Sequence, residues 1–264
     1  MRFSSLPFLF GFLPITLAIY FAVPLRWRNL ALLLTSLVFY GWGEPVYISI
    51  MVLSILIDYT HGLLVEKYRS RNKLARWFVA ESVLLNLGLL GFFKYWDFFA
   101  ANFSLIPGVS IPTLGLPLPI GISFFTFQTM SYTIDVYTGK IEKEKSFLQF
   151  ALYLSFFPQL VAGPIVKASE FLPQLKENRK VTLAGLESGI QIFVFGMFKK
   201  VVLADNISVF VDEVYRSPQI FGSGTVALAV AAYAIQIYMD FSGYSDIAIG
   251  TAKLLGIKLM KNFD

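Results

Sequence analysis

The stretch that decides the fold reads "FFPQLVAGPI" and covers residues 156–165. It is apolar apart from Gln159, but three helix-breaking residues interrupt it, Pro158, Gly163 and Pro164. Proline removes a helical hydrogen bond and glycine weakens a helix. Non-helical backbone is tolerated at membrane depth only where it is buried in protein or lines an aqueous cavity. The stretch therefore predicts a broken, re-entrant element beside a cavity. The alternative is an ordinary span kinked at Pro158.

The composition of the whole chain is that of an integral membrane protein. Of the 264 residues, 56% are hydrophobic and only 15% are charged, against about 25% charged in a soluble domain. There is no cysteine, which excludes disulfides and thiolate chemistry, and the single histidine, His61, excludes a multi-histidine metal site. The basic residues lie between apolar runs and follow membrane topology. We therefore expect membrane lipid, and no nucleic acid, as a partner.

Apolar runs that suit a hydrocarbon core of about 30 Å recur along the chain. The seven candidate spans are residues 6–23, 29–43, 46–65, 77–95, 118–138, 182–204 and 223–248. The first is interpreted as a retained span and not a cleaved signal peptide, because no convincing small-residue cleavage site follows it. Residues 97–117 are rich in proline, glycine and serine and predict an external loop or a short surface helix. Together these features predict an all-α, polytopic transmembrane protein in which residues 1–264 form a single membrane domain.

The positive-inside rule orients this arrangement with the amino terminus outside. The basic loops at 66–76 and 139–145 then lie in the cytoplasm. If residues 146–166 enter and leave on the same side, the basic segment at 167–180 is cytoplasmic too. A full crossing would instead translocate that segment, so the rule favours the re-entrant interpretation. Two neighbouring lysines, at 199 and 200, fit less well, because they fall near the outer end of their span.

Asp58 and His61 lie three residues apart on one face of an apolar run. A carboxylate that orients an imidazole would make a general base or a proton relay. The pair lies near the predicted cytoplasmic end of its span, where water is close. A capping or interfacial role is therefore favoured over catalysis.

Four further polar residues lie in predicted spans, Gln128, Asp135, Asp240 and Asp246. A charge at the centre of a span costs about 2.5–3.5 kcal/mol, so these side chains are expected to face a protein interior or a hydrophilic passage. For Gln128 and Asp135 the alternatives are a bond to a neighbouring helix and a position at the membrane interface. The pair Asp240 and Asp246 also leaves open a transporter or a non-catalytic membrane scaffold, although no inverted repeat supports it.

Four motifs resemble those of a known family. They are "GWGEP" at 41–45, "PIGISFFTFQTMSYTIDVYTGKI" at 119–141, "FFPQLVAGPIVKASEFLPQL" at 156–175 and "QIYMDFSGYSDIAIGTAKLLG" at 236–256. In this order they resemble the membrane-bound O-acyltransferase family, in the bacterial branch typified by the alginate O-acetyltransferase membrane subunit and the D-alanyl transfer protein of teichoic acids. Each motif alone is weak, but the four together are specific.

The resemblance implies a multi-helix funnel in the bacterial inner membrane. In it, an acyl thioester such as acetyl-CoA on the cytoplasmic side meets a hydroxyl acceptor on a cell-surface polysaccharide such as alginate. It implies no bound cofactor and no metal, and it leaves open exported acetyltransferase partner proteins. The residues expected to line the funnel or break its helices are Gln128, Asp135, Gln159, Gly163, Pro164, Asp240 and Asp246.

The resemblance assigns no catalytic residue within the chain. The family's catalytic histidine, which is thought to act as a general base on the acceptor hydroxyl, is expected after Asp264. His61 does not match that motif. The sequence is accordingly interpreted as the amino-terminal portion of a longer protein, and these residues alone are expected to be inactive.

Overall fold

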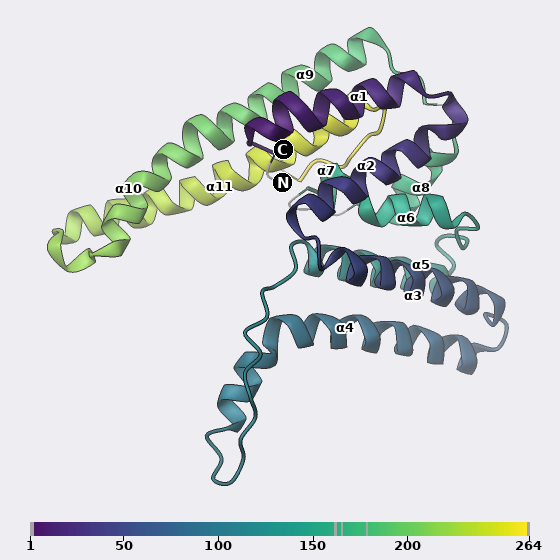
Figure 1. The fold of residues 1–264 in the computed structure, drawn as a ribbon, viewed down its shortest axis with the longest axis horizontal. Coiled ribbons are helices and arrows are strands. Elements are labelled where there is room, and N and C mark those ends of the chain that lie inside the picture. The colour runs from purple at the N-terminus through teal and green to yellow at the C-terminus, as the bar shows by residue number, and fades with distance from the viewer. Residues whose placement is uncertain (1–2, 161–162, 165, 178, 263–264) are drawn as a thin grey trace. The chain divides into compact units, whose positions relative to one another are not determined.

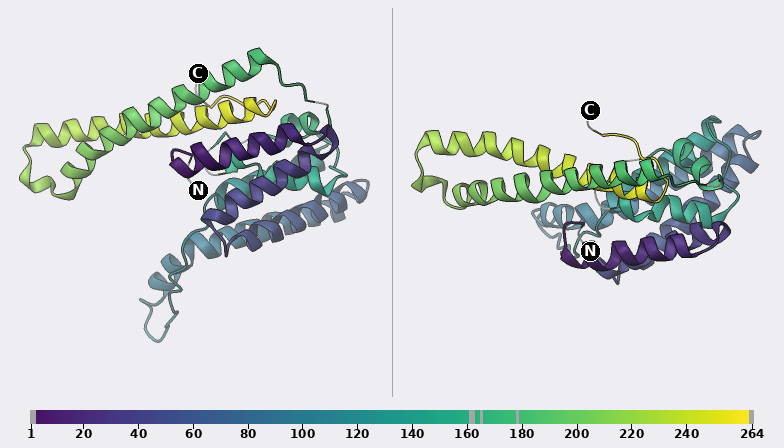
Figure 2. Two further views of the ribbon diagram at one scale, coloured as in Figure 1. Left: turned by 45° about the horizontal axis from the view of Figure 1, so that its top comes forward. Right: turned by 90° about the horizontal axis from the view of Figure 1, so that it is seen from above.

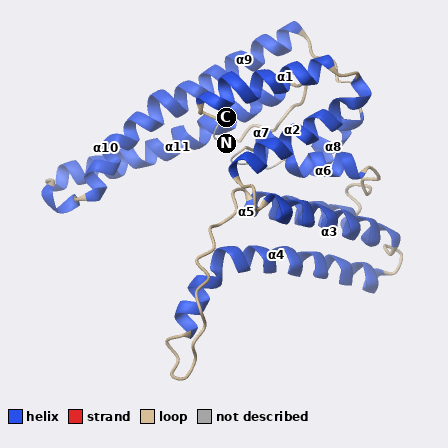
Figure 3. Cartoon of the chain, in the orientation of Figure 1, coloured by secondary structure: helices blue, strands red, loops and turns tan. Residues whose placement is uncertain are grey.

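The computed structural model describes residues 3–160, 163–164, 166–177 and 179–262 (Figure 1). Regular structure in these residues is helical throughout, without a strand (Figure 3). Figure 2 shows the same helices from two further sides. The prediction of an all-α membrane protein is confirmed.

The chain divides into two compact units. Residues 26–161 and 166–176 form what we call the middle unit, and residues 1–25, 162–165 and 177–264 form the terminal unit. Each unit is described by itself. The single membrane domain expected from the sequence stays a prediction.

Helices of very different length build the middle unit. They are α2 (Arg28–Gly43), α3 (Ile48–Lys67), α4 (Asn72–Phe103), α5 (Ile122–Thr138), α6 (Phe147–Ser155), α7 (Phe157–Leu160) and α8 (Ala168–Lys176), and a 3-10 turn over Leu25–Trp27 precedes α2. The helix α3 packs against α4 and α5, whereas α6 contacts α2, α3, α5 and α8. Every residue of α6 from Phe150 to Ser155 is buried. The apolar α6 therefore forms the centre of this unit.

The helix α4 extends beyond its predicted span. It has 32 residues and a length of about 48 Å, against about 30 Å for a hydrocarbon core. Residues 97–117 were predicted as a loop or a short surface helix; their first part, to Phe103, belongs to the long α4 helix, and the remainder is a loop. The carboxylate of Asp97 accepts the backbone N–H groups of Leu114 and Gly115 at 2.7 and 3.0 Å. These bonds fold the remaining loop back along the helix.

The terminal unit consists of a short amino-terminal helix and a long helical hairpin. Its elements are a π-helix (Phe8–Phe12), α1 (Leu13–Ala22), α9 (Leu183–Met197), a second π-helix (Phe198–Ala204), α10 (Asp205–Arg216), a 3-10 turn (Pro218–Ile220) and α11 (Ser223–Leu254). The run from α9 through α10 lies antiparallel to α11 (Figure 1). The Tyr20 hydroxyl of α1 donates to the Leu255 carbonyl at 2.8 Å, which ties α1 to the end of α11.

Glycines allow α9 and α11 to pack backbone against backbone. A Cβ atom at Gly196 would lie 2.8 Å from the carbonyl oxygen of Gly243, and one at Gly250 would lie 2.7 Å from that of Gly189. Small residues permit this close approach between helices in membranes. The hairpin therefore has no room for a side chain at Gly196, Gly243 or Gly250, and little room at Gly189.

Three of the described helices are long and apolar enough to cross a membrane, namely α3, α4 and α11. A shorter apolar helix covers Phe8–Ala22. All four lie over predicted spans, as do α2, α5 and α9, which have 16, 17 and 15 residues. The total of about seven spans stays a prediction.

Candidate functional site

The apolar segment at 146–166 breaks between α6 and α7. In an uninterrupted helix the Phe157 N–H would donate to the Tyr153 carbonyl four residues earlier. Here it donates to the Ser36 hydroxyl of α2, with 3.2 Å between N and Oγ. Pro158, the residue after Phe157, has no N–H, so it cannot donate the helical hydrogen bond either. The helix therefore breaks within the predicted stretch, whereas the re-entrant course of the segment stays a prediction.

Two of the predicted passage residues, Gln128 and Gln159, meet at the carbonyl that the break leaves free. Nε2 of Gln128 on α5 and Nε2 of Gln159 on α7 both donate to the Tyr153 oxygen, at 3.2 and 2.5 Å. Both glutamine side chains are buried. A buried carbonyl at a helix end needs a hydrogen-bond donor, so the two amides stabilise the break. Oε1 of Gln159 has no hydrogen-bond partner among the described residues.

A glycine brings the end of this segment close to α5. Gly121 precedes α5 with φ of +77°, a backbone conformation that glycine adopts without steric cost. A Cβ atom at this position would lie 2.5 Å from the Leu160 carbonyl oxygen. The approach of α7 to the start of α5 therefore requires glycine here.

The residues that flank the broken segment lie together. Glu144 precedes α6 and is buried, and its Oε2 lies 2.8 Å from Nζ of Lys176 at the end of α8. The Tyr153 hydroxyl donates to the Val166 carbonyl at 3.1 Å, which holds the returning chain against α6. With nine residues, α6 is about 14 Å long, less than half of a hydrocarbon core. The chain thus leaves one end of the middle unit before α6 and is back at the same end after α8.

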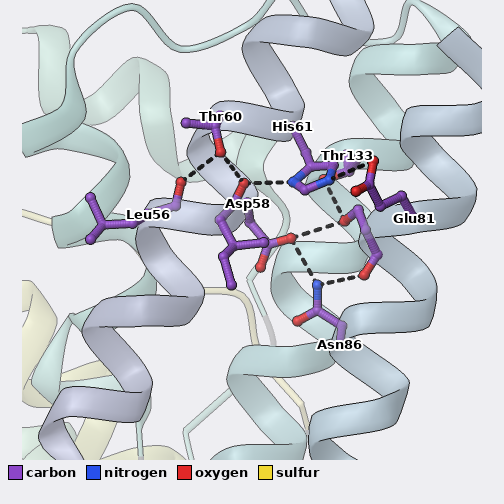
Figure 4. A network of polar contacts seen from close by, with 9 residues as sticks. Leu56, Asp58, Thr60, His61, Glu81, Asn86 and Thr133 are labelled. Atoms are coloured by element: carbon purple, nitrogen blue, oxygen red, sulfur yellow. Dashed lines mark hydrogen bonds and ion pairs between the residues drawn. The ribbon is translucent and has the colours of Figure 1, made fainter. Parts of the chain in front are cut away.

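A second polar cluster joins α3, α4 and α5 (Figure 4). Asp58 is fully buried, and its Oδ1 accepts hydrogen bonds from Ser82 Oγ at 2.9 Å and from Asn86 Nδ2 at 2.8 Å. The Thr129 hydroxyl of α5 donates to Asn86 Oδ1 at 3.1 Å. Oδ2 of Asp58 has no hydrogen-bond partner among the described residues. Asp58 and Asn86 also line a groove of about 340 Å³ between α3 and α4, whose other walls are mostly leucine.

His61 lies beside this cluster and does not form a relay with Asp58, the alternative that the sequence had left less favoured. Its Nδ1 donates to the Ile57 carbonyl at 2.7 Å, and its Nε2 lies 3.6 Å from Oε2 of Glu81 (Figure 4). In the described part of the chain, Asp58 accepts hydrogen bonds from α4 and none from His61. Because Asp58 is fully buried in protein, the expectation of an interfacial role for it is corrected.

The other three residues predicted around this segment are Asp135, Gly163 and Pro164. Asp135 lies near the end of α5, where its Oδ1 is 3.4 Å from Nζ of Lys140. Gly163 and Pro164 are outside the helices, and residues next to them, 161, 162 and 165, are outside the described part. Their assignment to a passage stays a prediction.

The two aspartates predicted in the last span, Asp240 and Asp246, are paired with lysines of the terminal unit. Nζ of Lys199 lies 2.7 Å from Asp246, and Nζ of Lys200 lies 2.5 Å from Asp240 and 2.7 Å from Asp205. Both lysines belong to the π-helix that joins α9 to α10, and π-helical turns are frequent at functional sites. The ion pairs explain why two lysines lie in this apolar run.

The sequence alone did not identify the partners in these contacts. Ser36 and Tyr153 are unremarkable within apolar runs, and Asn86 and Thr129 lie far from Asp58 in the chain. The one signal in the sequence was Lys199, whose position near the outer end of its span did not fit the topology and so indicated a partner. Among the described residues, no group of three or more His, Cys, Asp or Glu side chains would hold a metal ion.

These features define a class: an all-α membrane protein with a broken helix and polar groups satisfied inside apolar segments. The family model of the membrane-bound O-acyltransferases matches residues 139–264. About half of the chain is thus similar to this family.

Relatives with assigned names match over most or all of the chain. A protein named probable alginate O-acetylase from Pseudomonas putida is 38% identical over 100% of this chain and 55% of its own length. A peptidoglycan O-acetyltransferase from Helicobacter pylori is 36% identical over 100% of this chain and 56% of its own. A teichoic acid D-alanyltransferase from Bacillus subtilis is 24% identical over 83% of this chain and 58% of its own. The chain thus spans about half the length of the curated relatives that it matches.

Proposed function

We propose that this protein takes part in O-acyl transfer, in particular O-acetyl transfer, from a cytoplasmic thioester to hydroxyls of a cell-surface polysaccharide. The observation that carries the proposal is the identity of 36–38% to alginate O-acetylases and a peptidoglycan O-acetyltransferase over the entire chain. A thioester has a good leaving group, so the acceptor hydroxyl is the reactant that needs a base. His61 is not assigned this role, because its Nε2 faces Glu81 within the protein.

The broken helix is proposed as the wall of the acyl-transfer passage. Gln128, Gln159, Gly163 and Pro164 shape it, while Asp135, Asp240 and Asp246 contribute polar surface; none of them makes or breaks a bond. The half-exposed Asp240, with 41% of its side chain accessible, supports this assignment. A charge in an apolar helix is costly against lipid, so the face of α11 that carries Asp240 meets water or protein.

The proposed topology has residues 146–166 entering and leaving on the cytoplasmic side, with the amino terminus outside. The contact between Glu144 and Lys176 supports it, because a full crossing would separate these residues by about 30 Å. The loop at 139–146 also lies on the α3–α4 turn, where the Lys143 N–H donates to Glu66 at 2.6 Å. Two loops predicted to be cytoplasmic thus meet in the middle unit.

Cysteine labelling tests this topology, because the natural chain has no cysteine. Lys145→Cys and Glu170→Cys change exposed residues on either side of the broken segment. We expect a membrane-impermeant maleimide to label both from the cytoplasmic face only. Labelling of the two positions from opposite faces would refute the re-entrant topology.

An acyl-transfer assay tests the function. Native membranes from cells that carry the gene are given acetyl-CoA with a labelled acetyl group, and base-labile label is measured in the polysaccharide fraction. We expect ester formation that is absent from membranes of a deletion strain. Equal ester formation in both membranes would contradict the proposal.

A transporter that uses Asp240 and Asp246 is the second candidate. It is the weaker one, because each carboxylate is engaged by a lysine in the structure and is not free to bind a cation. Proton or sodium flux into proteoliposomes that Asp240→Asn abolishes would favour it over acyl transfer.

A further inference from the structure

The end of α4 and the loop after it stand apart from the other helices of the middle unit. Leu90 of α4 is buried against Ile122 and Phe125 of α5, and beyond it the only buried residue of α4 is Ala100. Figure 1 shows the end of α4 turning away from the direction of α3 and α5, with the loop returning beside it. We call residues 96–118 the arm.

Hydrogen bonds between the helix and the loop hold the arm in shape. Nε1 of Trp96 donates to the Pro112 carbonyl at 3.2 Å, and Oγ of Ser104 accepts the N–H of Ile111 at 3.0 Å. The Asp97 carboxylate adds the two bonds to loop N–H groups described above. The arm is therefore a defined structure, although few of its side chains are buried.

The surface of the arm is apolar and uncharged. No charged residue occurs between Asp97 and Asp135, whereas the average composition of a soluble domain would place about five in residues 98–118 alone. An exposed apolar surface of this kind marks a site of interaction with a membrane or another protein. The large apolar side chains exposed on the arm include Phe98, Phe99, Phe103, Leu105 and Ile106.

The arm begins where α4 has completed one crossing of a membrane. Residues 72–94 of this helix cover about 33 Å, against about 30 Å for a hydrocarbon core. Nζ of Lys94 lies 5.4 Å from the centre of the Tyr95 ring, and Trp96 follows. Lysine extends its ammonium group to the interface from the end of a span, and tyrosine and tryptophan are enriched there. The boundary between hydrocarbon and water therefore falls at the start of the arm.

The two parts of the arm have opposite needs for water. Residues 109–119 form no helix or strand, and such backbone is not tolerated against lipid in the hydrocarbon core. The exposed phenylalanines, in contrast, are unfavourable in water. The headgroup layer meets both needs, because it supplies water to the backbone and lets apolar side chains reach the acyl chains.

We propose that the arm lies in the membrane–water interface at the end of α4 and binds the surface of the phospholipid bilayer there. Its aromatic side chains enter the outer part of the acyl-chain layer, while the loop backbone stays hydrated. The arm thereby fixes the depth and the tilt of α4, as interfacial aromatic residues do. This surface goes beyond the proposed acyl transfer and does not rest on it.

Tryptophan fluorescence of the purified protein in lipid nanodiscs tests the position of the arm. The chain has four tryptophans, and the changes Trp27→Phe, Trp42→Phe and Trp77→Phe, all at exposed positions, leave Trp96 as the only indole. The phospholipids carry bromine, which quenches a nearby indole, either near the headgroup or near the ends of the acyl chains. We expect the shallow bromine to quench Trp96 more strongly than the deep bromine.

The matched control places the only tryptophan in a charged loop of the same unit. Glu142 is exposed between α5 and α6, and Glu142→Trp in a chain that also carries Trp96→Phe should be quenched less than Trp96 by both lipids. The variant Phe98→Glu/Phe103→Glu changes two exposed side chains of the arm, and its charges oppose contact with acyl chains. We expect it to shift the Trp96 emission to longer wavelength and to reduce the quenching.

Three results would overturn the proposal. Stronger quenching of Trp96 by the deep bromine would place the arm in the hydrocarbon core, and no quenching by either lipid would remove it from the bilayer. A dimer, detected by light scattering, in which the quenching is lost would assign the surface to a second copy of the chain. Because the first measurement leaves the arm itself unchanged, it does not depend on the folding of the glutamate variant.

Discussion

The two units keep a carboxylate inside apolar helices in different ways. In the middle unit, Asp58 is surrounded by neutral donors, Ser82 and Asn86, which tie α3 to α4. In the terminal unit, Asp246 is paired with the ammonium group of Lys199 across two helices that otherwise meet through glycine backbone. The first arrangement depends on hydrogen-bond geometry and the second on opposite charge. The two units should therefore respond differently to the same kinds of substitution.

The largest effect is expected where the terminal unit relies on backbone contact. The double variant Gly196→Ala/Gly250→Ala places two methyl groups within 3 Å of backbone atoms of the facing helix, so α9 and α11 must separate. We expect the free energy of unfolding to fall by about 4 kcal/mol, since each overpacked position costs about 1–3 kcal/mol. Chemical unfolding in detergent measures this.

The control for the glycine variant is Gly224→Ala. Gly224 lies in α11 with no neighbouring atom within 4 Å of an added Cβ, so this change should stabilise the helix by about 0.5–1 kcal/mol. If both variants lost the same stability, backbone packing would not distinguish the terminal unit.

The middle unit should respond most to loss of the Asp58 acceptor. Asp58→Leu leaves the Ser82 hydroxyl and the Asn86 amide without their shared acceptor, and we expect a loss of about 3 kcal/mol. Asp58→Asn keeps an oxygen at the site and should cost about half as much. Thermal unfolding of the two variants checks the order. A more harmful Asp58→Asn would show that the charge, and not the geometry, stabilises this unit.

Exchanging the two charges of the Lys199–Asp246 pair tests whether the terminal unit, unlike the middle unit, depends on opposite charge. Lys199→Met leaves Asp246 unpaired in a partly buried position, so we expect a loss of about 2 kcal/mol, between the values for exposed and buried pairs. The exchange Lys199→Asp/Asp246→Lys restores opposite charges and should recover about half of that stability. Unfolding by denaturant measures both variants, and an exchange no better than Lys199→Met would mean that charge pairing is not what stabilises the hairpin.

The smallest expected effect concerns the break between α6 and α7. Ser36→Ala removes the acceptor of the Phe157 N–H, and we expect a loss of about 1 kcal/mol. Ser49→Ala is the control, because Ser49 is exposed and its hydroxyl donates to the nearby Val46 carbonyl of the same chain segment. Limited proteolysis near the break should be faster in Ser36→Ala alone. Equal rates would remove Ser36 from the set of residues that stabilise the broken helix.

The sequence predicted the broken helix but not what satisfies it. Pro158 and its apolar neighbours carry a local signal, because proline disrupts a helix wherever it occurs. The convergence of Gln128 and Gln159 on Tyr153 depends on how α5 packs against α6, and no local pattern encodes that packing. The same limit applies to the partners of Asp58, which lie on neighbouring helices.

Errors in the predicted boundaries have a similar origin. The α4 helix continues to Phe103 although residues 97–117 have a loop-like composition, because the glycines and prolines of that range occur only in its second half. The π-helix at Phe198–Ala204 leaves no trace in the hydrophobic pattern. Lys199 and Lys200 were visible only as charges that did not fit the topology.

Four glycines at the contact between α9 and α11 recur every seven residues, at 189 and 196 on α9 and at 243 and 250 on α11. Because of this repeat, the glycine contacts alone do not fix the position of one helix along the other. A shift by one repeat would still bring Gly196 opposite Gly250. The bonds of Lys199 to Asp246 and of Lys200 to Asp240 have no such repeat. The ion pairs therefore set the register of the hairpin, in the way that a single polar residue sets the register of a coiled coil.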